Sequence, residues 1–219
     1  MDNKNRDQNF SWIDRGINRF KQVGTTIPMS QLKVYKSLKD RWVSGKTVID
    51  IGSSLGVGAN ILSHTARHVW GVDINEEAVK FANDIFARPN LSFEVMDIEN
   101  PTDRELAPFE VVVMSEVIEH LDNPEQGLNF VKRFFNQKTN TVGFITAPNI
   151  NNPEVKARDA ENFLHMHRWD VGQFYEFMIQ HFHSVTLFNG DIVDYWTSDE
   201  TIDGTSTCKL IVAKVEQPK

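Results

Sequence analysis

KTVIDIGSSLGVGAN, residues 46–60, places an apolar segment directly before a glycine-rich turn. Val48, Ile49 and Ile51 suit a strand that is buried on both faces, as the strands of parallel sheets are. Three glycines let the backbone bend sharply and approach a ligand closely: Gly52, Gly56 and Gly58. This order of strand, turn and following helix predicts a nucleotide-binding site.

A second apolar segment, 68–72, is followed by an acidic residue whose distance from the turn in the sequence is typical of a nucleotide site. This acid is Asp73, which follows Gly52 by 21 residues. An acid about 20 residues beyond a glycine-rich turn usually binds the hydroxyl groups of a ribose. The dinucleotide pattern G-x-G-x-x-G would need glycines where the chain has Ser54 and Val57, and no Gly-Lys-Ser/Thr follows. Nicotinamide and flavin cofactors and a P-loop are therefore excluded.

The turn instead has an acid followed by alternating small residues: Asp50, Gly52, Ser54 and Gly56. This pattern resembles motif I of the class I methyltransferases that depend on S-adenosylmethionine (SAM). In that family the acid and the small residues hold the methionine part of the cofactor, and the acid that ends the second strand holds its ribose. The resemblance implies these roles here, with Ser54 in place of the middle glycine.

Three further strands follow in the order and spacing of that family. Apolar segments at 91–97, at 111–114 and from Thr141 predict the third, fourth and fifth strands. The resemblance implies that the acid after the third strand caps the adenine amino group, and that the segment after the fourth borders the cofactor and the reacting centre. The cofactor-binding residues expected on these grounds are Asp50, Gly52, Ser53, Ser54, Gly56, Asp73, Ile74, Asp97, Ile98, Ser115 and Glu116.

Helix signals between the strands favour an α/β fold with a doubly wound parallel sheet. Asn75, Asn123 and Asp170 each stand where a helix would begin, before residues that form one apolar face. Two late apolar segments, 185–188 and 209–214, correspond in the family to an antiparallel hairpin at the sheet edge. The resemblance therefore implies a Rossmann-like, mostly parallel sheet of seven strands.

Two amphipathic helices are predicted ahead of the sheet, over 9–22 and 30–42. We therefore divide the chain into an N-terminal helical cover, residues 1–45, and a SAM-dependent methyltransferase domain, residues 46–219. In many family members such helices close over the cofactor and shape the substrate pocket. Plain packing of both helices against the sheet is the alternative.

Methyl transfer from a sulfonium is an in-line displacement, in which the protein mainly aligns the reacting atoms. An oxygen acceptor also benefits from a base or a metal that lowers its pKa, whereas a neutral amine needs little beyond the loss of a proton. Four residues could serve an oxygen acceptor: Glu116, Glu119, His120 and His165. We assign His120 and His165 to the acceptor side as candidate catalytic residues.

The spacing Glu-x-x-Glu-His at 116–120 supports two hypotheses. It resembles the metal-binding element of the small-RNA 3′-terminal 2′-O-methyltransferases, and His165, four residues before Trp169, matches their additional histidine. Glu-His after the fourth strand also occurs in small-molecule enzymes that resemble the ubiquinone-biosynthesis O-methyltransferases. We favour the second: SAM-dependent transfer to oxygen or nitrogen of a small molecule, with no assigned metal ligand. A metal-assisted RNA 2′-O-methyltransferase and a non-catalytic SAM-binding subunit are the alternatives.

Composition agrees with a single enzyme domain that does not enter a membrane. The chain has 219 residues and a net charge of −7, which disfavours a broad nucleic-acid surface. No apolar run approaches the length of a membrane span, and no basic-then-apolar leader is visible. The single cysteine, Cys208, cannot form an internal disulfide, so we expect a cytoplasmic protein. The sheet-edge strands and the N-terminal helices would permit a homodimer but do not require one, so monomer and homodimer both stay open. Tyr195 and Trp196 either wall a substrate pocket or cover the sheet edge.

Overall fold

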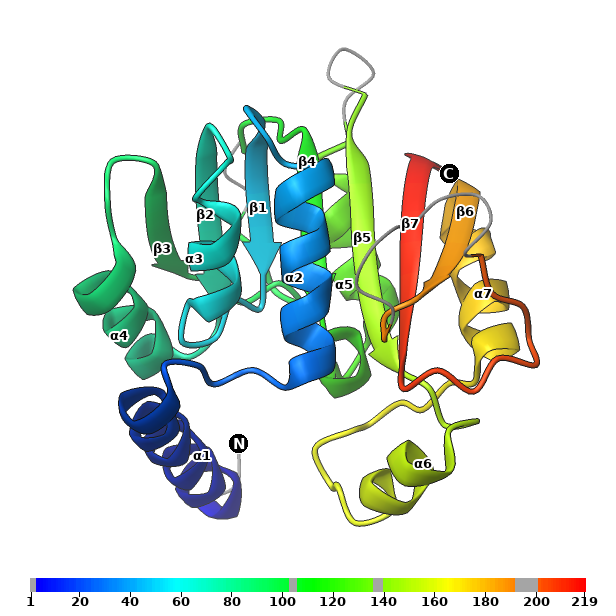
Figure 1. Ribbon diagram of the computed structural model, residues 1–219, viewed down its shortest axis with the longest axis horizontal. Coiled ribbons are helices and arrows are strands. Elements are labelled where there is room, and N and C mark those ends of the chain that lie inside the picture. The colour runs from blue at the N-terminus through cyan, green and yellow to red at the C-terminus, as the bar shows by residue number, and fades with distance from the viewer. Residues whose placement is uncertain (1–2, 103–105, 136–139, 192–200) are drawn as a thin grey trace.

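The sheet of the computed structural model has seven strands in the order β3-β2-β1-β4-β5-β7-β6 (Figure 1). The structure describes all residues except 1–2, 103–105, 136–139 and 192–200, and among these it describes side chains from Ile13 onward. The strands are β1 Thr47–Ile51, β2 His68–Asp73, β3 Leu91–Val95, β4 Val111–Ser115, β5 Val142–Pro148, β6 Phe182–Asn189 and β7 Leu210–Pro218. Their order and number confirm the predicted Rossmann-like, doubly wound α/β fold.

Only β7 runs against the other strands of this sheet. β1 pairs in parallel with β2 and β4, β2 pairs in parallel with β3, and β4 pairs in parallel with β5. β7 is antiparallel to both β5 and β6, which confirms the expected antiparallel hairpin at this side of the sheet. The carboxyl ends of the parallel strands meet at one edge, at the bottom of Figure 1, where open α/β sheets bind their ligands.

Helices cover both faces of the sheet, because successive side chains of each strand point to opposite faces. Val48 of β1 lies in the core beneath α2, α3 and α4, whereas Ile49 lies in the core beneath α5 and α7. α6 and the 3-10 helix η1 lie in the loops that follow β5 and β4. The helices after α1 are α2 Met29–Arg41, α3 Val57–Leu62, α4 Glu76–Phe86, η1 Ile118–His120, α5 Pro124–Lys132, α6 Pro153–Asp159 and α7 Val171–His181.

Polar side chains cap the helices where the sequence predicts that they begin. Asn75 and Asn123 accept hydrogen bonds from backbone amides in the first turns of α4 and α5. Asp170 and Gln173 form a reciprocal capping box at the start of α7. Each cap thereby fixes the loop that enters the helix from the carboxyl edge. Within the described part of the chain, no helix is both long and apolar enough to cross a membrane.

Two helices precede the sheet, as predicted, although the first is longer than expected. α1 covers Asn3–Val23 and so begins before residue 9, while α2 ends within one residue of the predicted boundary. Ile13 of α1 is buried against Leu55 of the glycine-rich turn and Ala78 of α4. α2 buries one face on the sheet through Val34, Tyr35 and Leu38. The division into a cover and a catalytic domain stays a prediction.

Candidate active site

The glycine-rich turn after β1 contains three residues with a left-handed backbone. These are Gly52 (φ 71°), Ser54 (φ 51°) and Gly56 (φ 81°), so a residue with a side chain adopts this conformation where the family has its middle glycine. A Cβ atom at Gly52 would lie 2.2 Å from Cγ2 of Val117, in the segment after β4. Packing against that segment, and not the backbone conformation alone, therefore requires glycine at this position.

Asp73 connects the end of β2 to this turn. Its Oδ2 accepts a hydrogen bond from the amide of Ser54 at 2.8 Å, and its Oδ1 accepts one from the amide of Asn75 at 2.9 Å. Burial raises the pKa of Asp73, and the two amides oppose this shift by favouring the charged form. The adjoining Ile74 is 56% exposed although it is large and apolar. An acid and an exposed apolar side chain thus stand together beside the turn.

Asp97 and Ile98 follow β3 and shape the next loop of the same edge. The carboxylate of Asp97 accepts hydrogen bonds from the amides of Glu99 and Asn100 and from Nδ2 of Asn100. The side chain of Ile98 is 8% exposed and belongs to the main hydrophobic core. Both residues therefore stabilise their own loop, and the adenine contact expected of Asp97 and the cofactor contact expected of Ile98 stay predictions.

Two side chains of α2 reach the ends of β1 and β4, which we did not predict from the sequence. Oη of Tyr35 donates a hydrogen bond to Oδ1 of Asp50 at 2.9 Å, and both residues are buried. Nε2 of Gln31 donates to the carbonyl oxygen of Ser115 at 3.1 Å. Burial raises the pKa of Asp50 to about 7, and the hydrogen bond from Tyr35 acts in the opposite direction. The sequence signalled only that Gln31 and Tyr35 belong to an amphipathic helix.

A short hydrogen-bonded chain joins Ser115 and Glu116 to Thr146 of β5. Oγ of Ser115 lies 3.1 Å from Oγ1 of Thr146, which accepts a hydrogen bond from the amide of Glu116 and donates one to its Oε1. Glu116 has a φ of 57°, which residues with side chains rarely adopt. Removal from water raises the pKa of Glu116 to about 7, against the effect of Thr146. Backbone strain and a shifted acid are both typical of functional sites.

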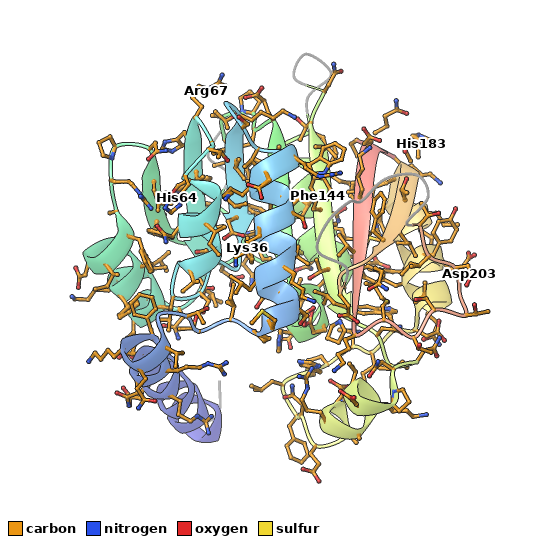
Figure 2. The ribbon with its side chains drawn as sticks, viewed as in Figure 1. Lys36, His64, Arg67, Phe144, His183 and Asp203 are labelled. Carbon is orange, nitrogen blue, oxygen red and sulfur yellow. The ribbon has the colours of Figure 1, made fainter. Side chains whose placement is uncertain are left out.

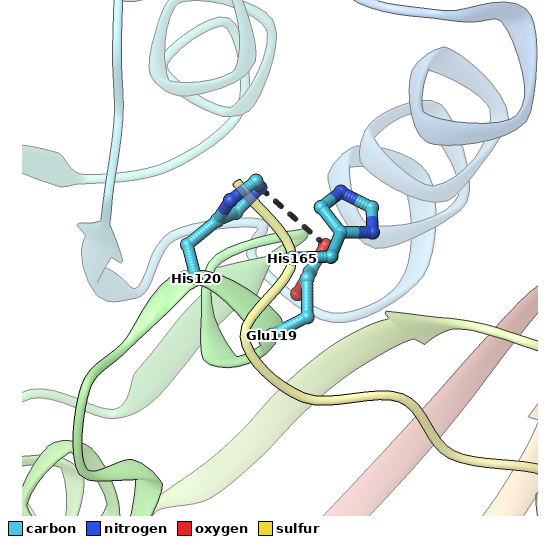
Figure 3. Close-up of side chains that lie close together, drawn as sticks. All are labelled: Glu119, His120 and His165. Atoms are coloured by element: carbon cyan, nitrogen blue, oxygen red, sulfur yellow. Dashed lines mark ion pairs between the residues drawn. The ribbon is translucent and has the colours of Figure 1, made fainter. Parts of the chain in front are cut away.

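Glu119, His120 and His165 form a cluster of side chains that could hold a metal ion (Figure 3). One ligand atom from each residue lies within 4.8 Å of the others. The side chain of Glu119 is 1% exposed, and neither carboxylate oxygen has a hydrogen-bond partner among the described residues. Nε2 of His120 lies 3.8 Å from Oε1 of Glu119. A carboxylate and two imidazoles are a donor set that fits a divalent cation.

Main-chain hydrogen bonds hold the two segments of this cluster together. The carbonyl oxygen of Glu119 accepts hydrogen bonds from the amides of Met166 at 2.8 Å and His167 at 3.1 Å. Nδ1 of His120 donates to the carbonyl oxygen of Leu164 at 2.9 Å. The rings of His120 and His165 consequently lie with their centroids 4.6 Å apart. The fold thus brings together the two histidines that the sequence assigned to the acceptor side.

Most of the predicted site residues gather in two neighbouring groups at the carboxyl edge, whereas Asp97 and Ile98 lie in the separate loop after β3. The turn group comprises Asp50, Gly52, Ser53, Ser54, Gly56, Asp73 and Ile74. The group after β4 comprises Ser115, Glu116, Glu119 and His120, together with His165 from the loop between α6 and α7. Figure 2 shows His64 and His183 away from this edge, which agrees with their omission from the predicted site. Tyr195 and Trp196, which the sequence suggested as pocket walls, lie outside the described residues.

A doubly wound sheet with these groups at its carboxyl edge defines a nucleotide-binding α/β protein. The chain belongs to the methyltransferase domain family, whose model matches residues 43–169, more than half of its length. The family match confirms the class I SAM-dependent methyltransferase domain that the motif predicts.

Known proteins are similar to this chain in part of the sequence and in the fold. The ubiquinone biosynthesis O-methyltransferase of Idiomarina loihiensis is 29% identical over 83 residues, which cover 37% of this chain and 34% of that protein. The match therefore spans about a third of that relative's length. A TehB-like SAM-dependent methyltransferase from Corynebacterium glutamicum has a TM-score of 0.64 at 16% identity, over 98% of this chain and 100% of that one. A SAM-dependent methyltransferase from Thermotoga maritima has a TM-score of 0.65 at 14% identity, over 94% of this chain and 98% of that one. These two likenesses concern the fold alone.

Proposed function

We propose that this protein transfers a methyl group from SAM to a hydroxyl oxygen of a small molecule, with help from a divalent cation. The observation that carries this proposal is the buried carboxylate of Glu119, which has no hydrogen-bond partner in the described structure and faces His120. A buried charge without a partner is costly, so such groups are normally paired or bind a metal. A cation would compensate Glu119 in the place where the acceptor is expected.

The turn after β1 fits the cofactor. The left-handed backbone at Gly52 and Ser54 keeps the turn tight, and Oγ of Ser53 is buried with no hydrogen-bond partner among the described residues. We assign Asp73 at the end of β2 to the ribose hydroxyls and Ile74, which is exposed beside it, to the flat base. SAM supplies the electrophilic methyl group and the thioether that leaves.

The group after β4 then serves the acceptor. A carbon–oxygen bond forms as the carbon–sulfur bond breaks, and the hydroxyl proton has to leave. A divalent ion between Glu119, His120 and His165 would lower the pKa of a hydroxyl that it contacts. Glu116 can accept the proton, because its pKa of about 7 suits a general base at neutral pH. This division of roles favours an oxygen acceptor over an amine, which needs no such help.

Exposed apolar side chains beside the cluster indicate an acceptor with an apolar part. Phe163, Leu164 and Met166 are 88%, 46% and 57% exposed, and they flank His165 in the chain. Large apolar side chains that are exposed close together in one segment are candidates for a contact surface. The matched relatives, named as ubiquinone biosynthesis O-methyltransferases, also support an oxygen acceptor.

A methyl-transfer assay tests the proposal and its alternatives together. Metal-stripped protein would be incubated with radiolabelled SAM and either phenols, catechols and alkyl alcohols or short RNAs with free 3′ ends. We expect labelled small-molecule ethers in the presence of Mg²⁺ or Mn²⁺, and none after chelation. Turnover that is equally fast in the presence of the chelator would refute the role of the cation. Label transferred to RNA would favour the RNA 2′-O-methyltransferase. Binding of S-adenosylhomocysteine without any turnover would favour the non-catalytic subunit.

Replacing Asp73 by alanine is expected to weaken the binding of S-adenosylhomocysteine by about 10- to 100-fold. The reason is the loss of charged hydrogen bonds to the ribose, each worth about 1.5–3 kcal/mol. Calorimetric titration measures the affinity, and a thermal melt verifies that the variant is folded. Asp84→Ala, which removes an exposed carboxylate of α4 paired with Lys80, is the matched control and should bind normally. Unchanged affinity in a folded Asp73→Ala protein would refute the ribose assignment.

A further inference from the structure

We infer that Asp159 is a positioning residue that orients His165 toward the cation expected between Glu119 and His120. This inference rests on the cation in the proposed function. Asp159 is the last residue of α6 and is 3% exposed. Its Oδ1 contacts Nδ1 of His165, so it meets that histidine on the side of the ring next to the backbone.

Arg168 compensates the buried charge of Asp159. Nε of Arg168 lies 2.5 Å from Oδ2 of Asp159, while the same guanidinium donates hydrogen bonds to the carbonyl oxygens of Asp159 and Asn162. These contacts join the two ends of the segment from Asp159 to Arg168. Residues 160–167 contain no helix or strand, so these contacts restrain the loop that carries His165 together with its main-chain hydrogen bonds to Glu119.

The contact with Asp159 decides which nitrogen of His165 is available to a ligand. Nδ1 of His165 lies against a carboxylate oxygen, which can only accept hydrogen bonds, so this contact favours the tautomer with its hydrogen on Nδ1 and the free lone pair on Nε2. His120 is prepared in the same way, because its Nδ1 donates to the carbonyl oxygen of Leu164. Metal-binding histidines characteristically donate their second N–H to a carboxylate or a carbonyl oxygen. The surroundings of both histidines therefore favour the tautomer that a metal site requires.

Manganese binding to the protein saturated with S-adenosylhomocysteine tests this inference. Paramagnetic resonance would measure the Mn²⁺ affinity, and electron spin-echo modulation would report the histidine nitrogens that are bound to the ion. We expect Asp159→Asn to weaken Mn²⁺ binding by about 10- to 100-fold, the usual cost of losing such a partner, and to reduce the modulation from one nitrogen. Asp159→Glu should restore part of both signals.

Three controls separate positioning from a general effect on the fold. Glu161→Gln removes an exposed carboxylate from the same loop and should bind Mn²⁺ as the wild type does. Unchanged affinity for S-adenosylhomocysteine shows that Asp159→Asn is folded. In a His165→Ala background, the Asp159 substitution should have no further effect on Mn²⁺ affinity, because Asp159 acts only through that ring.

Two outcomes would overturn the inference, and they can be told apart. If the wild type binds Mn²⁺ and Asp159→Asn binds it with the same affinity and the same nitrogen signals, Asp159 does not position His165, and the proposed function stands. If the wild type binds no Mn²⁺ while binding S-adenosylhomocysteine, the cation of the proposed function fails and the inference fails with it.

Discussion

Glu119→Gln is expected to lower the rate of methyl transfer by at least about 100-fold, because a bound metal stabilises the transition state by several kcal/mol. The substitution keeps the size of the side chain but removes the only negative charge of the three-residue cluster. Rates at saturating Mg²⁺ and saturating SAM would measure the loss. Glu125 is an exposed glutamate in the first turn of α5, so Glu125→Gln is the control and should keep the wild-type rate.

The same substitution is expected to stabilise the metal-free protein, and more so at higher pH. Burial raises the pKa of Glu119 well above its ordinary value of 4.5, and the neighbouring Glu116 raises it further. A carboxyl whose pKa is higher in the folded protein favours folding fully only below pH 4.5, and this contribution is lost as the pH rises. Glutamine does not titrate, so the variant avoids that loss.

Denaturant unfolding between pH 5 and 8 would measure this second effect. The stability difference between Glu119→Gln and wild type should grow by up to about 1.4 kcal/mol per pH unit. Lower activity combined with higher stability is the pattern of a residue retained for function. A variant that loses activity and also loses stability at every pH would instead identify Glu119 as a structural residue.

Gly52→Ala is expected to destabilise the protein by about 2–5 kcal/mol. The left-handed backbone costs a residue with a Cβ roughly 1–2 kcal/mol, and forced contact in a packed region costs about 1–3 kcal/mol more. The contact is severe, because the new methyl group would lie 2.2 Å from Cγ2 of Val117. Thermal melts should show a midpoint lower by roughly 5–20 °C.

Gly45→Ala separates the two causes. Gly45 has a φ of 69°, close to the 71° of Gly52, but its added Cβ would have no heavy atom within 4 Å among the described residues other than Gly45 and its two chain neighbours. It should therefore show the backbone cost alone. In a Val117→Ala background, Gly52→Ala should cost about 1–3 kcal/mol less, since the 2.2 Å contact with Cγ2 is removed and only the Cβ at 3.3 Å remains. Equal destabilisation by Gly45→Ala and Gly52→Ala would show that packing against Val117 is unimportant.

Local patterns were enough to predict the sheet and the turn group. Strand ends, helix caps and the distance from Gly52 to Asp73 are short-range features, and each determines the backbone near its own residues. The capping box of Asp170 and Gln173 is an example, because both partners lie within one helical turn. The order of strands followed from the family resemblance and from the alternation of strands and helices.

Contacts between distant segments could not be predicted in this way. Gln31 reaches Ser115 across 84 residues, and Tyr35 approaches Asp50 only because α2 packs on the sheet. Asp159 resembles any acid near a helix end in the sequence, and its burial beside His165 depends on how the loop after α6 folds back. Glu119, His120 and His165 were recognised as candidates from a family pattern, whereas the unpaired, buried state of Glu119 is visible only in the structure.

The most direct test of the proposed active site is anomalous diffraction from crystals grown with S-adenosylhomocysteine and Mn²⁺. We predict one manganese peak among Glu119, His120 and His165, about 2.1 Å from a carboxylate oxygen and from one nitrogen of each histidine. The cofactor product should lie along the turn after β1 in the same crystals. Clear density for S-adenosylhomocysteine at that turn, with no anomalous peak in the cluster, would contradict the account.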